Sequence, residues 1–164
     1  MNLELQVCSL ELAKRLKELG VKQESYFYYR DEYGKPDNIH NYKIMIWSFV
    51  LGSKNIDERN GAYECISAFT ASELLNILPR MVDTKINEPF NNYRLNMTMS
   101  LVVEDNVAKR VYLINYDCDI RKIEDLCFPS KQLFQHNIWD KNLANALAKT
   151  LIYLIENGLL KNDH

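Results

Sequence analysis

Between Tyr93 and Val103 apolar and polar residues alternate, apart from Val102, and this pattern restricts the fold more than any other in the chain. The apolar members of the alternation are Tyr93, Leu95, Met97, Met99, Leu101 and Val103. Successive side chains of a β-strand point to opposite faces of the sheet, so a period of two predicts a strand with one buried and one solvated face. The turn-forming segment 104–106 then leads into Val107–Tyr116, which we expect to return as an antiparallel partner.

Three other segments carry leucines at helical spacing, together with residues that start or stop helices. The first helix should run from Ser9 to Gly20, and the second from the capping box Thr70–Glu73 to Pro79. The third should begin at Asp140 or Asn142 and end at Gly158. The third helix also contains several alanines, which favour helix formation and close packing.

Three short strands are expected between the first and second helices. They are the aromatic segment Ser25–Arg30, the apolar run Ile44–Leu51 and the segment Ala62–Ala68. The first two should pair as an antiparallel hairpin, and the third should extend the sheet. The expected order is α-β-β-β-α-β-β-α, which predicts an α+β domain spanning residues 1–164. We expect one antiparallel sheet of about five strands with the helices packed on one face.

Composition argues against several classes of function, namely nucleic-acid binding, zinc binding and membrane insertion. The 164 residues suit one domain, and the net charge of −2 disfavours an extended nucleic-acid surface. The four cysteines form no CxxC pair, which predicts reduced thiols rather than a zinc site. Neither a signal peptide nor a membrane-length apolar run is recognisable, so the sequence predicts a cytoplasmic protein without membrane contact.

Three stretches together resemble a family of small uncharacterised proteins found in bacteriophage and prophage genomes. They are Val7–Gly20, Ser67–Leu74 and Ala144–Gly158, and they fall on the three expected helices. The resemblance implies a shared fold and a phage-related origin, but no activity, ligand or catalytic residue. The segments 41–61 and 117–139 match nothing familiar, so a specialised role would lie there.

Candidate catalytic residues are few. The histidines are His40, His136 and His164, and Cys127 lies nine residues before His136. Acidic residues at 117, 119, 124 and 125 could hold a divalent cation, although Arg121 and Lys122 lie among them. Glycine-rich phosphate loops, G-x-S-x-G and H-E-x-x-H are all missing. A small metal-assisted enzyme that uses the acids of 117–125 and His136 is therefore the alternative function rather than the leading one.

The aromatic segment offers the best candidate binding surface. Tyr26, Tyr28 and Arg30 should share one side of a strand, with Phe27 and Tyr29 on the other. Such a surface could bind a protein or stack unpaired bases. In the structural alternative, one side of the strand packs in the core and the other forms an ordinary cross-strand ladder of aromatic side chains.

The leading prediction is a non-catalytic protein-binding or accessory module of a phage or prophage. It would act through a host or phage protein and use no cofactor. Nucleic-acid binding through residues 26–30 is the weaker alternative, and a homodimer stays open.

Overall fold

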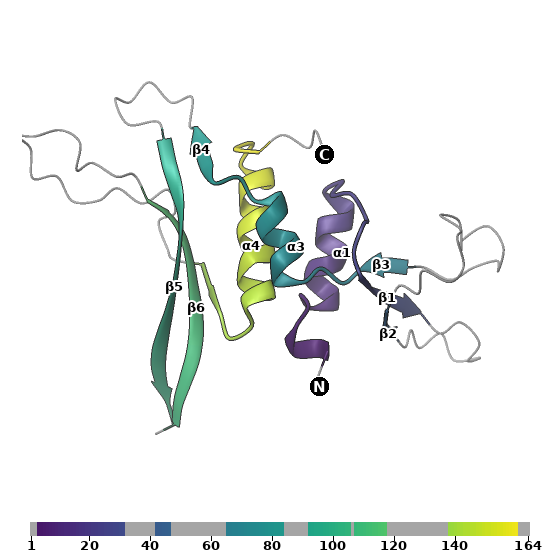
Figure 1. The fold of residues 1–164 in the computed structure, drawn as a ribbon, viewed down its shortest axis with the longest axis horizontal. Helices are drawn as coiled ribbons and strands as arrows, with labels where there is room; N and C mark the ends of the chain where they lie inside the picture. Colours follow the sequence, from purple (N-terminus) through teal and green to yellow (C-terminus); the bar gives the residue numbers. More distant parts are fainter. Residues whose placement is uncertain are drawn as a thin grey trace, which may run out of the picture.

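A computed structural model describes residues 3–31, 42–46, 65–83, 92–105, 107–117 and 138–160. Its elements confirm the predicted α+β class with antiparallel sheet (Figure 1). In chain order they are η1 (Leu3–Leu5), α1 (Leu10–Glu18), β1 (Phe27–Asp31), β2 (Tyr42–Ile46), β3 (Cys65–Ser67), α3 (Ala71–Ile77), β4 (Met81–Asp83), β5 (Asn92–Glu104), β6 (Val107–Asp117), β7 (Ile138–Asp140) and α4 (Leu143–Glu156).

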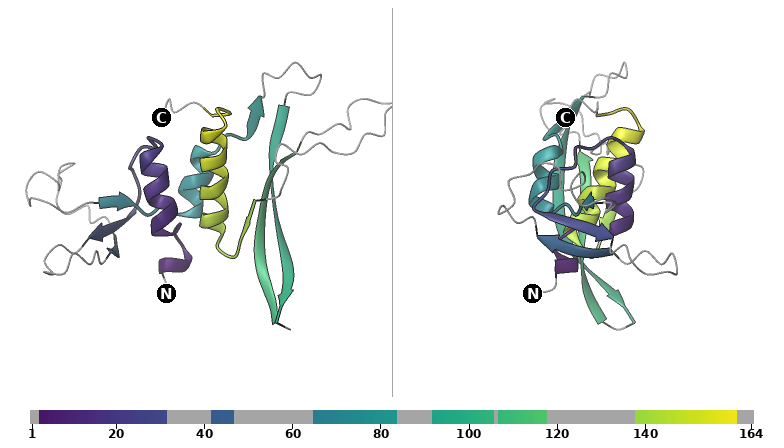
Figure 2. Two further views of the ribbon diagram at one scale, coloured as in Figure 1. Left: turned by 180° about the vertical axis from the view of Figure 1, so that it is seen from behind. Right: turned by 90° about the vertical axis from the view of Figure 1, so that its right-hand side faces the viewer.

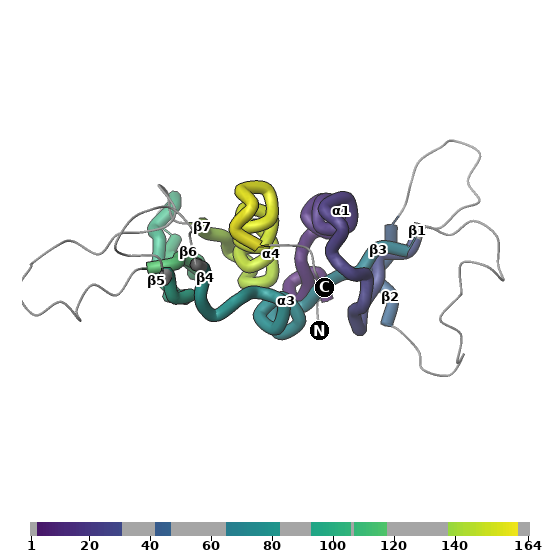
Figure 3. The backbone as a smooth tube through the Cα atoms, turned by 90° about the horizontal axis from the view of Figure 1, so that it is seen from above, coloured from purple at the N-terminus to yellow at the C-terminus, as the bar shows by residue number. Residues whose placement is uncertain are grey.

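The described strands form two sheets, of three and four strands, which corrects the expectation of a single sheet of about five strands. One has the order β2-β1-β3 and the other β4-β5-β6-β7. The helices lie between them, with α4 against β6 and β7, and α1 against β3 (Figures 2 and 3). The helices therefore form a layer between two sheets, whereas the sequence predicted helices on one face of a single sheet. Periodicity could not foresee this division, because it identifies the apolar face of a strand but not the sheet to which the strand belongs.

The predicted helix boundaries are confirmed. The Ser9 hydroxyl accepts a hydrogen bond from the Leu12 amide, and Thr70 and Glu73 form the expected reciprocal capping box. Asn142, rather than Asp140, caps α4 by accepting from the Ala144 amide at 2.8 Å. Gly20 and Gly158 adopt positive φ angles of 81° and 66° just after α1 and α4. Glycine takes this backbone conformation without steric cost, which explains why both helices stop there.

Helix α4 is the centre of the core. Its buried residues are Ala144, Ala146, Leu147, Ala148, Thr150, Leu151 and Leu154. Thr150 is the polar member of this set, and its hydroxyl donates to the Ala146 carbonyl at 2.9 Å. The helix packs against α1, α3, β6 and β7. No helix in the described part of the chain has the length and apolar character needed to cross a membrane.

The small sheet follows the predicted pairing. β1 pairs antiparallel with β2 on one side and with β3 on the other. The strand expected over Ile44–Leu51 is seen as Tyr42–Ile46, and residues 47–51 lie outside the described residues. Tyr29 and Ile66 point into the core, and the Tyr29 hydroxyl donates to the Cys8 carbonyl at 2.7 Å.

Candidate functional site

The longest strands, β5 and β6, form a hairpin whose two ends have different surroundings. Residues with odd numbers on β5 share the face that points toward α4, here called the near face, with Tyr112, Ile114 and Tyr116 of β6. At the base of the hairpin, Tyr93 is 4% exposed and Ile114 and Tyr116 are fully buried. The Tyr116 hydroxyl donates to the Pro79 carbonyl, which fastens this end to the chain after α3. The base of the hairpin is therefore part of the core.

Towards the tip, the same face becomes exposed. The exposed fractions are 45% for Met97, 59% for Met99, 64% for Leu101 and 69% for Val103. Figure 1 shows the reason, since the hairpin continues past the N-terminal end of α4. We call Met97, Met99, Leu101 and Val103 the hairpin stripe. The prediction that the alternation from Tyr93 to Val103 has one buried face is thus right at the base and wrong along the stripe.

The opposite face of the tip carries an ion-pair cluster. Glu104 accepts hydrogen bonds from Lys109 of β6 at 2.9 Å and from Lys141, just before α4, at 2.8 Å. The hydrogen bonds from Lys141 and Lys109 lower the pKa of Glu104 to about 2. Val102 and Val107 beside it are 40% and 56% exposed. The tip is thus tethered by charge on one face, while the stripe on the other lies open.

The outer edge of β5 is covered only near its base. β4 pairs with residues 92–94, and the Leu95 amide donates to the Arg80 carbonyl at 3.0 Å. Beyond Leu95, no strand in the part of the chain that the structure describes pairs with this edge. Residues 95–103 contain no charge, proline or glycine. Natural proteins usually protect free strand edges with such residues, because unpaired amides and carbonyls are a template for another strand.

The predicted binding residues lie on the opposite side of the molecule, in and beside the small sheet. Tyr26 precedes β1 and is 74% exposed, whereas Tyr28 and Arg30 lie on β1 and are half-buried. The Tyr28 hydroxyl accepts from the Ser25 amide at 3.2 Å. Phe27 and Tyr29 of the other side pack in the core, as the structural alternative expected. Of the three predicted residues only Tyr26 is exposed, and Met45, opposite Tyr28 on β2, is a further exposed side chain of this surface.

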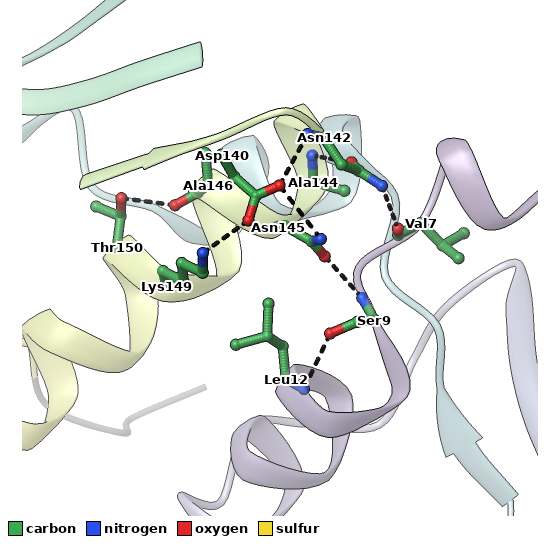
Figure 4. A network of polar contacts seen from close by, with 10 residues as sticks. All are labelled: Val7, Ser9, Leu12, Asp140, Asn142, Ala144, Asn145, Ala146, Lys149 and Thr150. Atoms are coloured by element: carbon green, nitrogen blue, oxygen red, sulfur yellow. Dashed lines mark hydrogen bonds and ion pairs between the residues drawn. The ribbon is translucent and has the colours of Figure 1, made fainter. Parts of the chain in front are cut away.

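A network of polar side chains joins the N-terminal segment to the start of α4 (Figure 4). Asp140 accepts hydrogen bonds from the Asn142 amide, the Asn145 side chain and Lys149, the last at 2.6 Å. Asn145 accepts from the Ser9 amide at 2.7 Å, and Asn142 donates to the Val7 carbonyl at 3.0 Å. An open depression lies beside this junction, lined by Ile138, Trp139, Asp140, Lys141 and Lys149. Because the polar groups of the junction bind one another, its arrangement is typical of a structural connection.

Electrostatics support that interpretation. Burial opposes ionisation of Asp140, but the hydrogen bonds from Lys149, the Asn142 amide and Asn145 outweigh it and lower the pKa of Asp140. Burial raises the pKa of the Cys8 thiol to about 12, which keeps it protonated and unreactive. Burial likewise raises the pKa values of Tyr29 and Tyr116. These shifts follow from packing in the core and from the structural junction.

Most of the residues proposed for metal-assisted chemistry lie in segments that the structure does not describe. His40, Cys127, His136, His164 and the acids after Asp117 lie outside the described residues. Within the described ranges, no group of three or more His, Cys, Asp or Glu side chains is arranged to hold a metal ion. The hairpin stripe was visible in the sequence as an alternation, but nothing in a single strand indicates where its covering helix ends.

The chain was also compared with known proteins. No protein family, no curated protein and no solved structure matches it.

Proposed function

We propose that this chain is a non-catalytic binding protein that contacts a partner protein through the hairpin stripe. The observation that carries the proposal is the rise in exposure along one apolar face, from 4% at Tyr93 to 69% at Val103. Single exposed apolar residues are ordinary on protein surfaces, but a contiguous row of them marks an interaction site. The stripe is such a row, with four consecutive members of one strand face.

The chemistry of the stripe suits protein recognition. Methionine is enriched in protein interfaces, and its flexible thioether adapts to the shape of a partner. Each large apolar side chain that moves from water into an interface contributes roughly 1.5–3 kcal/mol before the costs of association. Four such side chains on a hairpin held in place at its base and at Glu104 can supply enough contact for specific binding.

The setting proposed for this binding is a phage or prophage accessory role, with a host or phage protein as the partner. Its support is the resemblance of the three helical stretches to phage proteins. The identity of the neighbouring genes tests this setting, since phage genes of related role lie together. A gene neighbourhood without phage genes would contradict the phage setting and leave the binding proposal intact.

The experiment uses a photo-crosslinking amino acid in cells that express the chain. Placed at Leu101, it should capture a discrete partner band, because Leu101 lies in the middle of the stripe and is 64% exposed. The same amino acid placed at Tyr26, which is 74% exposed, is the matched control. The double variant Met99→Asp with Leu101→Asp should lose the partner in affinity purification, while Tyr26→Asp should retain it.

The converse result would overturn the proposal. Capture at Tyr26 and loss of the partner in Tyr26→Asp would move the binding surface to the small sheet. That outcome would instead favour the aromatic surface of Tyr26, Tyr28 and Arg30, for which the exposure of Tyr26 is the supporting observation. Capture at neither position would leave the stripe without a role in binding.

A further inference from the structure

We infer that two copies of this chain pair through the outer edges of their β5 strands, antiparallel to each other, with the two-fold axis at Ser100. The inference concerns the edge of the strand. It therefore goes beyond the proposed function, which concerns the near face. Its premise is the uncharged edge of β5 past Leu95, which no strand of the described residues covers.

The direction of each backbone group along this edge follows from the bond between the Leu95 amide and the Arg80 carbonyl. Backbone groups of alternate residues point to the same side of a strand. Since Leu95 points outward, the amides and carbonyls of Met97, Met99, Leu101 and Val103 also point outward. The residues between them point inward and pair with β6. Four residues therefore present hydrogen-bonding groups that another strand could satisfy.

A second copy satisfies all four in one register. Pairing Met97 with Val103 of the other copy, and Met99 with Leu101, uses every outward-facing residue that Arg80 does not already occupy. Both pairs are centred on Ser100, so the two-fold axis passes through the position where Ser100 lies opposite Ser100 of the other copy. The same register places apolar side chains opposite apolar ones on the near face. Thr98 lies opposite Val102, and Ser100 opposite Ser100.

The charges that flank the edge are complementary in this arrangement. The exposed residues Arg80 and Arg94 lie at the base of β5, and the acids Glu104 and Asp105 lie at its tip. An antiparallel two-fold pair brings Glu104 and Asp105 of each copy beside Arg94 of the other, and Glu104 is at the same time bound by Lys109 and Lys141 of its own copy. Arg94 and Glu104 lie on the same face of the strand and would be diagonal neighbours, a spacing that long side chains bridge. Within residues 95–103 there is no charge to repel its symmetry mate.

A second copy fits this edge better than an unrelated strand, because one short sequence supplies both the apolar match and the charge match. An isologous interface requires this kind of self-complementarity. The pairing joins the two hairpins into one continuous sheet. The two hairpin stripes then lie side by side, and the near face that a partner would contact is twice as wide.

The test begins with sedimentation of the full chain over a range of concentrations. We expect a dimer at micromolar concentrations, and a chain that stays monomeric up to about 100 µM would overturn the inference, since a complex that weak is held by less than about 6 kcal/mol. The variant Ser100→Cys then locates the two-fold axis. Directly opposite residues in a non-hydrogen-bonded pair have Cα atoms about 4.5 Å apart, which suits a disulfide.

The matched control is Thr98→Cys. Its symmetry mate would lie four residues along the partner strand, about 14 Å away at the usual rise per residue, which is too far for a disulfide. Under mild oxidation we expect the covalent dimer to form at least tenfold faster for Ser100→Cys than for Thr98→Cys, with the four native cysteines common to both. Equal rates would overturn the register and with it the edge pairing.

This experiment separates the two proposals. Ser100 lies on the face opposite the hairpin stripe, so its variant leaves the stripe unchanged. Because Leu101 lies opposite Met99 of the other copy in the dimer, the captured protein is identified by mass spectrometry. Failure of the dimer with continued capture of a different protein at Leu101 would contradict only the pairing. A dimer that captures only a second copy of this chain would contradict only the proposed binding function.

Discussion

Helix α4 and the β5–β6 hairpin both carry a regular apolar pattern, yet only the helix is covered along its whole length. Seven residues of α4 are buried, from Ala144 to Leu154. On the near face of β5, burial ends after Leu95, and exposure reaches 69% at Val103. A regular pattern therefore shows that a face is apolar, but the element opposite decides whether that face is buried.

The difference follows from the dimensions of the two elements. α4 has 14 residues and β5 has 13. At the usual rise per residue, the helix is about 21 Å long and the strand about 44 Å. A helix with one residue more than the strand can thus cover only about half of its length. The uncovered half is the tip, where the hairpin stripe lies.

The largest expected effect contrasts Leu151 of α4 with Leu101 of the stripe. Leu151 is fully buried, so Leu151→Ala should lower the free energy of unfolding by about 2–5 kcal/mol through lost burial and a residual cavity. Leu101 is 64% exposed, and Leu101→Ala should change the free energy of unfolding of the monomer by less than about 0.5 kcal/mol. Urea denaturation of dilute protein measures both. A Leu101→Ala loss as large as that of Leu151→Ala would mean that the stripe belongs to the core.

A smaller effect is expected at the junction between α4 and the N-terminal segment. Asn142 caps α4, and its side-chain amide also donates to the Val7 and Glu4 carbonyls. Asn142→Ala should therefore lower the free energy of unfolding by about 1–2 kcal/mol. Asn157→Ala is the control, because the side chain of this exposed asparagine donates to the Tyr153 carbonyl of the same helix and ties it to no other element in the described residues. We expect a change below about 0.5 kcal/mol there, and equal losses would contradict the tethering role of Asn142.

Much of the local structure could be predicted from the sequence, because the signals are short-range. The caps at Ser9, Thr70 and Asn142 and the stops at Gly20 and Gly158 depend on residues within one helical turn. The division into two sheets could not be predicted, because it depends on contacts of α4 with elements far away in the sequence. β4 and β7 have three residues each, which is too short for a period to appear.

The candidate site was harder to predict than the fold. The alternation from Tyr93 to Val103 was recognised, but its interpretation as a face buried throughout assumed a cover of equal length. The predicted binding surface was instead the aromatic segment, since tyrosine and arginine are common in binding surfaces. In the structure its core side is buried, and Tyr26 is its prominent exposed residue. The difference in length between α4 and β5 is the feature that indicates an uncovered tip.

Acid sensitivity offers a finer comparison between the junction and the hairpin, beginning with Asp140. Its hydrogen bonds lower its pKa in the folded state, so its ionised form stabilises the fold. This contribution is complete above the ordinary carboxyl pKa of about 4 and is lost as the pH falls through the lower pKa of the folded state. Asp140→Asn should therefore destabilise the protein more at pH 7 than at pH 3, as measured by denaturant midpoints. Asp105→Asn, at the exposed turn, is the control, and an equal pH dependence in the two variants would contradict the role of Asp140.

The smallest effect is expected at Glu104, where charge rather than apolar burial holds the tip. The hydrogen bonds from Lys141 and Lys109 lower its pKa to about 2, so the ion pairs persist down to about that pH. In Lys141→Gln the carboxyl resonance of Glu104 should titrate at a higher pH, nearer the ordinary glutamate value of about 4.3, because one of its two cations is gone. The change in overall stability should be slight, since pairs this exposed are screened by solvent. An unchanged titration would mean that Lys141 does not reach the tip. The hairpin would then be anchored only at its base, and the position of the stripe would depend on the base alone.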